Sequence, residues 1–344
     1  MSALPAITRR RLIQSAAGAS VAIGLGCATP LSASSATTPW RRTSKNLGAM
    51  VFVKQGEFEK DLAATVAAGF TWIRMDIPIG SYGWFDNDGK FNTTPGVAEF
   101  YLRAVQQAKD AGLRIVLVMA SMYNSDSWSE AEFRERNGRY LRAVARNIGK
   151  YVDIWQIFNE HDGRDYRNHA PIELSEAYLG RMRSALRALR GVLREFSTAA
   201  VTTTPFGYPI DQARYDKWVR FFDGVGPSLD VICVHAYPEK SIDTITRVPT
   251  YMRNLRERYQ KPVGILEFGL PSVDGYGDAA EVGRVVAAQI AAVMSVGPVV
   301  ASLYQLRDRG TSRTDGELAF GILNQDWTKK QYYDVVSDEV RKWR

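Results

Sequence analysis

The stretch from Tyr151 to Asp162, which reads YVDIWQIFNEHD, constrains the fold more than any other part of the chain. Its apolar, β-branched and aromatic residues are followed abruptly by Asn159 and Glu160. Such a run is typical of a parallel strand that is buried on both faces. Because a carboxylate at the tip of a buried strand is costly, we interpret Glu160 as a candidate functional group.

A second stretch, from Lys261 to Gly269, has the same pattern. It reads KPVGILEFG and places Glu267 at the end of another apolar run. If both strands belong to one closed parallel barrel, their carboxyl ends share a rim. Two glutamates on one rim are the carboxyl pair that glycoside hydrolysis requires. The alternative is that these glutamates form structural ion pairs.

From Asn46 onward, strand and helix patterns alternate, which predicts βαβ units and a (β/α)8 barrel. A barrel of this kind takes about 250 residues, so residues 46–344 fit one domain better than two. The eight expected strands are Leu47–Val53, Trp72–Ile79, Leu113–Ala120, the stretch Tyr151–Asp162, Ala199–Pro205, Leu229–Tyr237, Val263–Phe268 and Val299–Leu306.

The first residues of the chain have the pattern of an export signal. TRRRLIQ at residues 8–14 precedes a short run of small and apolar residues, which predicts a twin-arginine-type signal over residues 1–36 and a linker over 37–45. We therefore expect a periplasmic or secreted protein without an integral membrane segment in its mature form. A retained anchor and a lipid anchor at Cys27 are the alternatives.

The composition argues against several other classes of protein. Cys27 lies in the predicted signal, so Cys233 offers neither a disulfide nor a cysteine metal site, and the sequence contains only three histidines. We expect no metal and no cofactor. The formal net charge is +7, but the basic residues are dispersed, which argues against a nucleic-acid partner. We expect a monomer whose partner is a polysaccharide or oligosaccharide substrate.

Polar residues collect at the carboxyl ends of the expected strands, and solvation alone does not account for this. Besides the two glutamates, the strand ends offer Arg74, Asp76, Ser121, Met122, Tyr123, Asn124, Asn159, His235, Tyr237, Tyr304, Arg307 and Asp308. Aromatic residues on the following segments, among them Trp84, Tyr123 and Trp128, are suited to cover the apolar faces of sugar rings.

The Asn159-Glu160 pair, the strand-end Glu267 and the His235-x-Tyr237 motif between them resemble clan A glycoside hydrolases. The resemblance extends from about Asn46 to the closing segment DGELAFGILNQDWTKKQYYDVV. It is greatest to family 39-like and family 5-like endoglycosidases, some of which trim bacterial exopolysaccharides. It implies a (β/α)8 barrel with a retaining mechanism.

The resemblance also implies residue roles. Glu160 corresponds to the acid/base and Glu267 to the nucleophile, while Asn159 would bind the sugar 2-hydroxyl. Arg74 and Tyr237 would flank the nucleophile, and His235 would shape the same subsite. In members of the clan, the last strand of the barrel often ends in a tryptophan that lies below the reactive sugar. The corresponding aromatic residue here is Tyr304.

Physical chemistry supports these roles independently of the resemblance. A retaining mechanism needs one carboxylate that attacks and one carboxylic acid that protonates the leaving oxygen, about 5 to 5.5 Å apart. A guanidinium at Arg74 would keep Glu267 ionised, and a hydroxyl at Tyr237 would orient it. We therefore expect an exported, endo-acting enzyme that cleaves β-glycosidic bonds by double displacement. The alternatives are a non-catalytic carbohydrate-binding barrel and a transglycosylase with the same glutamates.

Other interpretations stay open for several residues. Arg74 could instead neutralise Asp76, and His235 could be a core histidine. His161 and Asp162 could line the cleft or stabilise a loop. Arg307 and Asp308 could pair with each other or contact a charged sugar.

Overall fold

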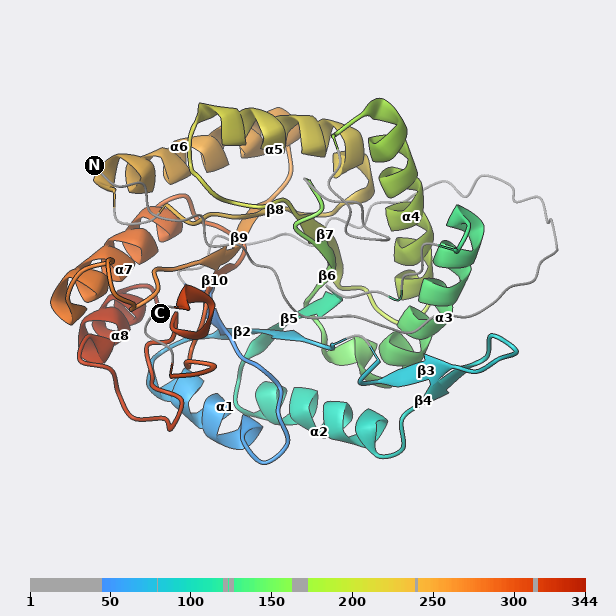
Figure 1. The fold of residues 1–344 in the computed structure, drawn as a ribbon, viewed down its shortest axis with the longest axis horizontal. Helices are drawn as coiled ribbons and strands as arrows, with labels where there is room; N and C mark the ends of the chain where they lie inside the picture. The colour runs from blue at the N-terminus through green and yellow to red at the C-terminus, as the bar shows by residue number, and fades with distance from the viewer. Residues whose placement is uncertain are drawn as a thin grey trace.

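The computed structural model describes residues 45–78, 80–119, 123, 127–162, 173–238, 241–311 and 315–344. The predicted export signal and nearly all of the predicted linker lie outside the described residues, as do Ser121, Met122 and Asn124. The body of the chain forms a (β/α)8 barrel, as the alternating pattern predicted (Figure 1).

Eight parallel strands make the barrel in the sheet order β7-β6-β5-β2-β1-β10-β9-β8. They are β1 (Leu47–Met50), β2 (Trp72–Asp76), β5 (Arg114–Met119), β6 (Ile154–Asn159), β7 (Ala200–Thr204), β8 (Ile232–His235), β9 (Val263–Phe268) and β10 (Ala301–Leu303). All eight expected strands are present. The expected bounds were generally longer, because the flanking apolar residues are buried outside the hydrogen-bonded ladders.

The ladder of strand pairs stops between β7 and β8, the two ends of the sheet order. Two backbone hydrogen bonds close the ring there, from Asp230 N to Val201 O at 2.8 Å and from His235 N to Pro205 O at 3.3 Å. The carboxyl ends of all eight strands therefore meet at one rim.

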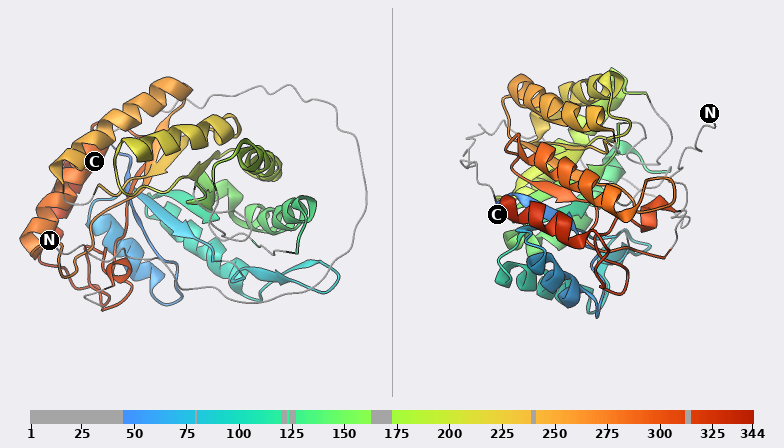
Figure 2. Two further views of the ribbon diagram at one scale, coloured as in Figure 1. Left: turned by 45° about the horizontal axis from the view of Figure 1, so that its top comes forward. Right: turned by 90° about the vertical axis from the view of Figure 1, so that its left-hand side faces the viewer.

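A ring of helices surrounds the strands in Figure 1: α1 (Phe58–Ala67), α2 (Val97–Asp110), α3 (Glu130–Ile148), α4 (Glu176–Arg194), α5 (Gln212–Val225), α6 (Ile242–Tyr259), α7 (Ala279–Met294) and α8 (Tyr333–Lys342). Ser129 and Glu132 form a capping box at the start of α3. Helices α7 and α8 lie side by side on one flank of the barrel (Figure 2). Short 3-10 helices cover Gly149–Tyr151, Gly226–Ser228 and Gly316–Leu318.

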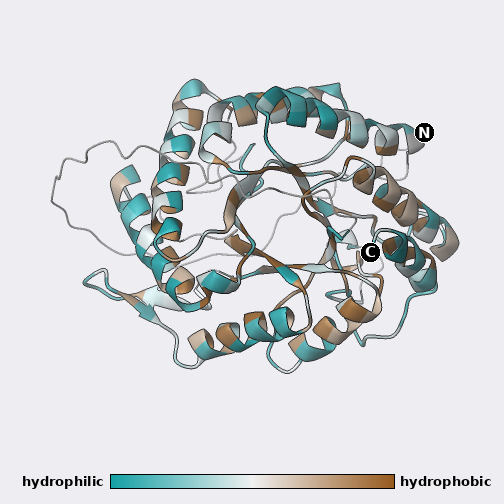
Figure 3. Cartoon of the chain, turned by 180° about the vertical axis from the view of Figure 1, so that it is seen from behind, coloured by the Kyte–Doolittle hydropathy of each residue, from teal (hydrophilic) through white to brown (hydrophobic). Residues whose placement is uncertain are grey.

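Strand alternation divides the core into two layers. One buried cluster, which includes Trp72, Ile154, Ala200 and Cys233, comes from the barrel strands and the residues beside them, so it fills the barrel interior. The larger cluster joins outward-facing strand residues such as Trp155 to the helices. In Figure 3 the helices alternate between hydrophobic and hydrophilic residues, as expected for helices that cover a barrel.

A β-hairpin follows β2 and was not among the expected elements. It consists of β3 (Gly83–Phe85) and β4 (Phe91–Thr93), which pair antiparallel. Each strand has only three residues, which is too short for periodicity to reveal. Within the described part of the chain, no helix is long and apolar enough to cross a membrane.

Candidate active site

Glu160 and Glu267 approach each other at the carboxyl-end rim of the barrel. Glu160 directly follows β6, and Glu267 lies in β9. Three atoms lie within 4.8 Å of one another: a carboxylate oxygen of Glu160, a carboxylate oxygen of Glu267 and a ring nitrogen of His235. Two side chains that are 107 positions apart in the sequence therefore share one site. This convergence is the geometry that the strand-end positions predicted.

Arg74 forms an ion pair with Glu267 in the candidate site. Its Nη1 atom lies 2.9 Å from Glu267 Oε1, and both side chains are almost completely buried. Nε of Arg74 donates to Gln156 Oε1 at 2.9 Å, and Nη2 donates to Asn159 Oδ1 at 3.2 Å. The direct contacts of Arg74 are thus with the candidate site, which favours the functional interpretation over neutralisation of Asp76.

The position of Arg74 follows from the strand period. Arg74, Gln156 and His235 lie two residues after Trp72, Ile154 and Cys233, which belong to the cluster inside the barrel. Residues two apart on a strand point to the same face. The three polar side chains therefore form the next interior layer toward the rim, directly below the glutamates.

His235 and Tyr237 connect the two glutamates to β8. His235 Nδ1 lies 2.8 Å from Glu160 Oε1 and 3.4 Å from Glu267 Oε2. The hydroxyl of Tyr237 donates a hydrogen bond to Glu267 Oε2. His235 is fully buried, but its contacts place it in the site rather than in the apolar core.

The backbone around Glu160 departs from regular strand geometry. Phe158 and Glu160 have φ values of 64° and 59°, in the left-handed region that residues other than glycine rarely adopt. The register between β6 and β7 shifts between Gln156 and Asn159, and Glu160 N donates to Thr204 O at 2.7 Å. Backbone strain of this kind clusters at functional sites, where it directs a side chain away from its regular position.

Gly207 is required by a close backbone approach beside the site. A Cβ atom at this position would lie 1.7 Å from the carbonyl oxygen of His235. The carbonyl of Gly207 also accepts a hydrogen bond from Tyr237 N at 2.8 Å. The segment after β7 thus fixes the backbone that carries both His235 and Tyr237.

An aromatic cluster borders the site on the side of β1 and β10. Met50, Tyr237 and Tyr304 are buried together, with Phe52 and Phe320 packed against them. The ring of Tyr304 lies 6.4 Å from that of Tyr237 in an edge-on arrangement. Tyr304 therefore packs beside Tyr237, which contacts Glu267. A role for Tyr304 below the reactive sugar stays a prediction.

The predicted rim aromatics are less closely tied to the glutamates. Trp84 lies on the β3–β4 hairpin and is 47% exposed. Tyr123 packs against Phe85 of this hairpin and donates a hydrogen bond to Gly83 O. The guanidinium of Arg136 lies 4.7 Å from the ring centre of Trp128. A substrate role for these three residues stays a prediction.

The structure also separates the interpretations left open for four further residues. Buried His161 packs its ring on Phe158, and Asp162 accepts from Phe206 N at 2.8 Å and from Arg214 at 2.8 Å. These contacts indicate loop stabilisation. Arg307 and Asp308 do not pair with each other, because Arg307 binds Glu57 and Asp61 while Asp308 binds Lys330.

Two aspartates near the site, Asp76 and Asp162, have pKa values above the ordinary value for this residue. Burial raises the pKa of Asp76 above its ordinary value, and the nearby Glu267 raises it further, although the positive charges of Arg74 and Arg309 oppose this. Burial likewise raises the pKa of Asp162, against the hydrogen bond from Phe206 N and the charge of Arg214. The pKa of Asp76 therefore depends in part on the charges of Arg74 and Glu267 in the candidate site.

Glu160, His235 and Glu267 are also a donor set of the kind that could hold a metal ion. The Arg74 guanidinium lies 2.9 Å from Glu267 and so places a positive charge beside this donor set, which would repel a metal cation. This repulsion favours chemistry carried by the carboxyl groups themselves.

Sequence reasoning missed Gln156 and Gly207. Gln156 Nε2 donates to Asn159 Oδ1 at 2.7 Å and to Thr204 Oγ1 at 2.8 Å, so it orients the residue before Glu160. Its polarity within an otherwise apolar strand is a signal that could have identified it. The sequence contained no comparable signal for Gly207, because its requirement comes from a segment that is distant along the chain.

Comparisons with known proteins identify a family for this chain. The family model described as "Glycosyl hydrolase catalytic core" matches residues 127–317, which contain Glu160, His235, Tyr237 and Glu267. A comparison with curated proteins gives no significant match.

Several solved structures share the fold at low sequence identity. The GH5_18 protein from Streptomyces cattleya in complex with GlcNAc is 16% identical with a TM-score of 0.69, over 88% of this chain and 81% of that one. A family 39 glycoside hydrolase from Bacteroides cellulosilyticus WH2 is 15% identical with a TM-score of 0.64, over 87% and 64%. An exo-β-1,4-mannosidase from Opitutaceae bacterium strain TAV5 is 16% identical with a TM-score of 0.66, over 86% and 59%.

Proposed function

The chain belongs to the glycosyl hydrolase catalytic core family, and on this premise we propose that it is a retaining glycosidase with Glu267 as nucleophile and Glu160 as acid/base. One observation carries the proposal: carboxylate oxygens of the two glutamates lie within 4.8 Å. Retaining enzymes have their carboxyl groups about 5 to 5.5 Å apart, whereas inverting enzymes leave about 6.5 to 9.5 Å for a water molecule.

In the first step, a carboxylate oxygen of Glu267 forms a bond to the anomeric carbon while the bond to the leaving oxygen breaks. The proton of Glu160 passes to that oxygen, so the departing sugar leaves as an alcohol. Arg74 supports this step because its buried guanidinium favours the ionised form of Glu267. The Tyr237 hydroxyl holds the attacking carboxylate in a single orientation.

In the second step, Glu160 accepts a proton from water, and the oxygen of that water bonds to the anomeric carbon. The ester bond to Glu267 breaks, which returns both carboxyl groups to their starting states. His235 Nδ1 lies 2.8 Å from Glu160 Oε1, so the ring orients the group that must first give and then take a proton.

The proposed sugar contacts follow from the same network. Oδ1 of Asn159 accepts hydrogen bonds from Arg74 and Gln156, whereas no described residue accepts one from its Nδ2 donor. This arrangement suits a hydrogen bond to the 2-hydroxyl. The ring of Tyr304 provides an apolar wall for the reactive sugar.

We extend the proposal to a β-linked polysaccharide that is cleaved internally. The exposed rings of Trp84 and Tyr208 support it, because they offer sugar-binding surfaces away from the reactive centre. The β-glucosidase and exo-β-1,4-mannosidase names among the structural neighbours support a β-linkage. Export through the twin-arginine-type pattern of residues 1–36 is part of the same proposal.

The test uses wild type, Glu160→Ala, Glu267→Ala and the control Glu257→Ala, which removes an exposed carboxylate on α6. All four proteins are assayed on aryl β-glycosides and on a glycan panel, with products identified by mass spectrometry and NMR. We expect both site variants to lose activity by about 10³-fold or more, with folding kept by circular dichroism, and the control to match wild type.

The stereochemistry of the first product distinguishes the mechanisms. A retaining enzyme releases the β-anomer first, and azide should restore turnover to one or both alanine variants. An α-anomer together with no azide rescue would exclude double displacement. Binding of glycans without any turnover by wild type would favour the carbohydrate-binding barrel, and transfer onto an added sugar acceptor would favour transglycosylation.

A further inference from the structure

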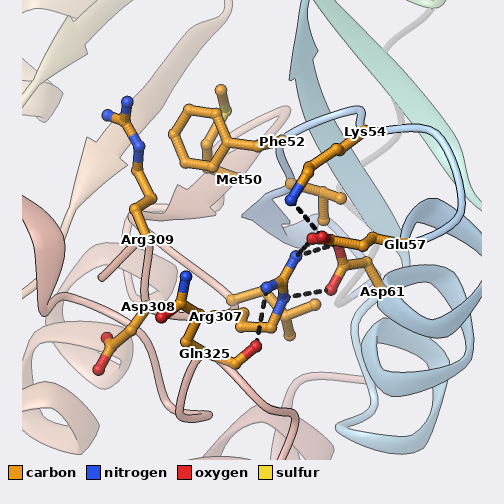
Figure 4. Close-up of a pocket in the computed structure, with 11 residues that line it drawn as sticks. Met50, Phe52, Lys54, Glu57, Asp61, Arg307, Asp308, Arg309 and Gln325 are labelled. Carbon is orange, nitrogen blue, oxygen red and sulfur yellow. Dashed lines mark hydrogen bonds and ion pairs between the residues drawn. The ribbon is translucent and has the colours of Figure 1, made fainter. Parts of the chain in front are cut away.

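A cavity of about 220 Å³ lies beside the candidate active site, between the carboxyl ends of β1 and β10 (Figure 4). Its lining includes Met50, Phe52, Lys54, Arg307, Arg309 and Gln325. The cavity adjoins the reactive centre through Met50, because Arg74 Nη1 approaches Met50 Sδ at 3.4 Å and the same guanidinium binds Glu267. Its position is suited to the sugar unit next to the one being cleaved.

A series of side-chain contacts connects Glu267 with Phe52, which lines this cavity. Tyr237 contacts Glu267, the ring of Tyr304 lies 6.4 Å from Tyr237, and the ring of Phe52 lies 6.4 Å from Tyr304. Both ring pairs meet edge-on, at 85° and 82°. Of these three rings Phe52 lines the cavity, while Tyr237 and Tyr304 are buried behind it. The ring of Phe52 is suited to cover the apolar face of a sugar unit.

Most charged side chains that line the cavity form ion pairs with neighbouring residues. Arg307 binds Glu57 and Asp61 and donates to Gln325 O at 2.9 Å. Lys54 pairs with Glu57, and the Asp308 carboxylate lies 2.7 Å from Lys330. These contacts assign Arg307 and Asp308 to the framework of the cavity and not to recognition of a charged sugar.

Arg309 is the exception among the cavity residues. Its side chain is exposed, and no described residue forms an ion pair or hydrogen bond with its guanidinium. The guanidinium lies 4.5 Å from the ring centre of Phe52 and apart from the Arg307 network in Figure 4. Burial raises the pKa of Asp76, and the positive charge of Arg309 opposes this increase.

We infer that this cavity is a subsite for an acidic sugar unit, of the uronic-acid class, whose carboxylate binds Arg309. The inference rests on the proposed function for the cleavage itself and adds the substrate class. A planar guanidinium binds a carboxylate through two parallel hydrogen bonds, and stacking on Phe52 orients it in advance. The sugar ring would lie along Phe52, with its carboxylate at the Arg309 guanidinium.

The test measures binding separately from turnover, on full-length protein carrying Glu160→Gln so that ligands stay intact. Short oligosaccharides of alginate, gellan and xanthan are each compared with their carboxyl-reduced forms by titration calorimetry. The second substitution is Arg309→Gln, with Arg284→Gln as the matched control, because Arg284 is an exposed arginine on α7.

We expect at least one acidic oligosaccharide to bind about tenfold or more tightly than its reduced form, with the difference shrinking at high salt. Arg309→Gln should abolish this preference and Arg284→Gln should keep it. Equal binding of both forms, a preference that survives Arg309→Gln, or no binding of any acidic oligosaccharide would overturn the inference.

The two proposals fail in distinguishable ways. If the glutamate variants abolish turnover but carboxyl reduction has no effect on binding, the glycosidase stands and the acidic subsite fails. If carboxylate-dependent binding requires Arg309 but wild type cleaves nothing in the panel, the subsite stands and the proposed cleavage fails.

Discussion

Arg74 and Glu267 form an ion pair of 2.9 Å in which the side chains are only 2% and 6% exposed. Removing two charges from water costs several kcal/mol per ion, and mutual attraction offsets this only when the remaining donors and acceptors are also satisfied. Gln156 and Asn159 meet that condition for the guanidinium, and Tyr237 meets it for the carboxylate. These three neighbours therefore help to make the buried Arg74–Glu267 ion pair tolerable inside the barrel.

Arg74→Met should strongly destabilise the protein. It leaves Glu267 buried without its cation, and breaking a buried pair from one side costs about 3 to 5 kcal/mol. Urea denaturation measures the loss. The double variant Arg74→Met/Glu267→Gln should recover a large part of it. Arg258→Met is the matched control, because the Arg258–Asp223 pair has the same 2.9 Å distance but about half-exposed partners, and it should cost less than about 1 kcal/mol.

Tyr237→Phe should lower kcat by about tenfold to a hundredfold with little effect on folding. The hydroxyl bonds to a charged acceptor, and such bonds contribute about 1.5 to 3 kcal/mol. Steady-state kinetics on a cleaved glycan measures the effect. Tyr259→Phe removes a hydroxyl that bonds Val219 O and Asp223 on the outer helices, so it should leave kcat unchanged. Equal kinetics for both variants would contradict the orienting role of Tyr237.

Asp162 should contribute a defined pH dependence to stability. Burial raises its pKa in the folded state, so the folded protein retains this proton more tightly than the unfolded chain does. The associated stabilisation is present at low pH and is lost as pH rises from about 3.8 through the raised value. The difference in unfolding free energy between wild type and Asp162→Asn should therefore fall as pH rises.

Asp326→Asn provides a comparison, because Asp326 should contribute to stability with the opposite pH dependence. Hydrogen bonds from Thr328 lower the pKa of Asp326, so its stabilisation is present above the unfolded pKa and is lost as pH falls. Urea denaturation of the three proteins across the acid range measures both differences. If the two differences changed in the same direction with pH, the assignment would be contradicted.

Gly207→Ala should disrupt the site from outside it. A Cβ atom there would overlap the His235 carbonyl oxygen, so the backbone that carries His235 and Tyr237 must shift. We expect a large loss of kcat and a lower melting temperature. Gly180→Ala is the control, since a Cβ at this position in α4 meets nothing within 4 Å and alanine favours a helix by about 1 kcal/mol. This second variant should be neutral or more stable, with full activity.

The barrel and the two glutamates were predictable because their signals are local. The apolar strands that end at Glu160 and Glu267 are consecutive residues, and strand alternation places Arg74 on the interior face. The β3–β4 hairpin and the role of Gly207 were not predictable in this way. The hairpin strands are too short to show a periodic pattern. The close backbone approach at Gly207 depends on a segment that is distant in the chain.

The sequence by itself determined the strand–helix alternation, the apolar interior and the carboxylates at two strand ends, since burial and strand period depend on neighbouring residues. Only the tertiary structure decided which charges meet. It paired Arg74 with Glu267, placed His235 beside Glu160, and joined Arg307 to Glu57 and Asp61 while Arg309 stayed outside that network. Partners of this kind come from strands and loops far apart in the chain, and only the arrangement of these strands in the barrel brings them within hydrogen-bonding distance.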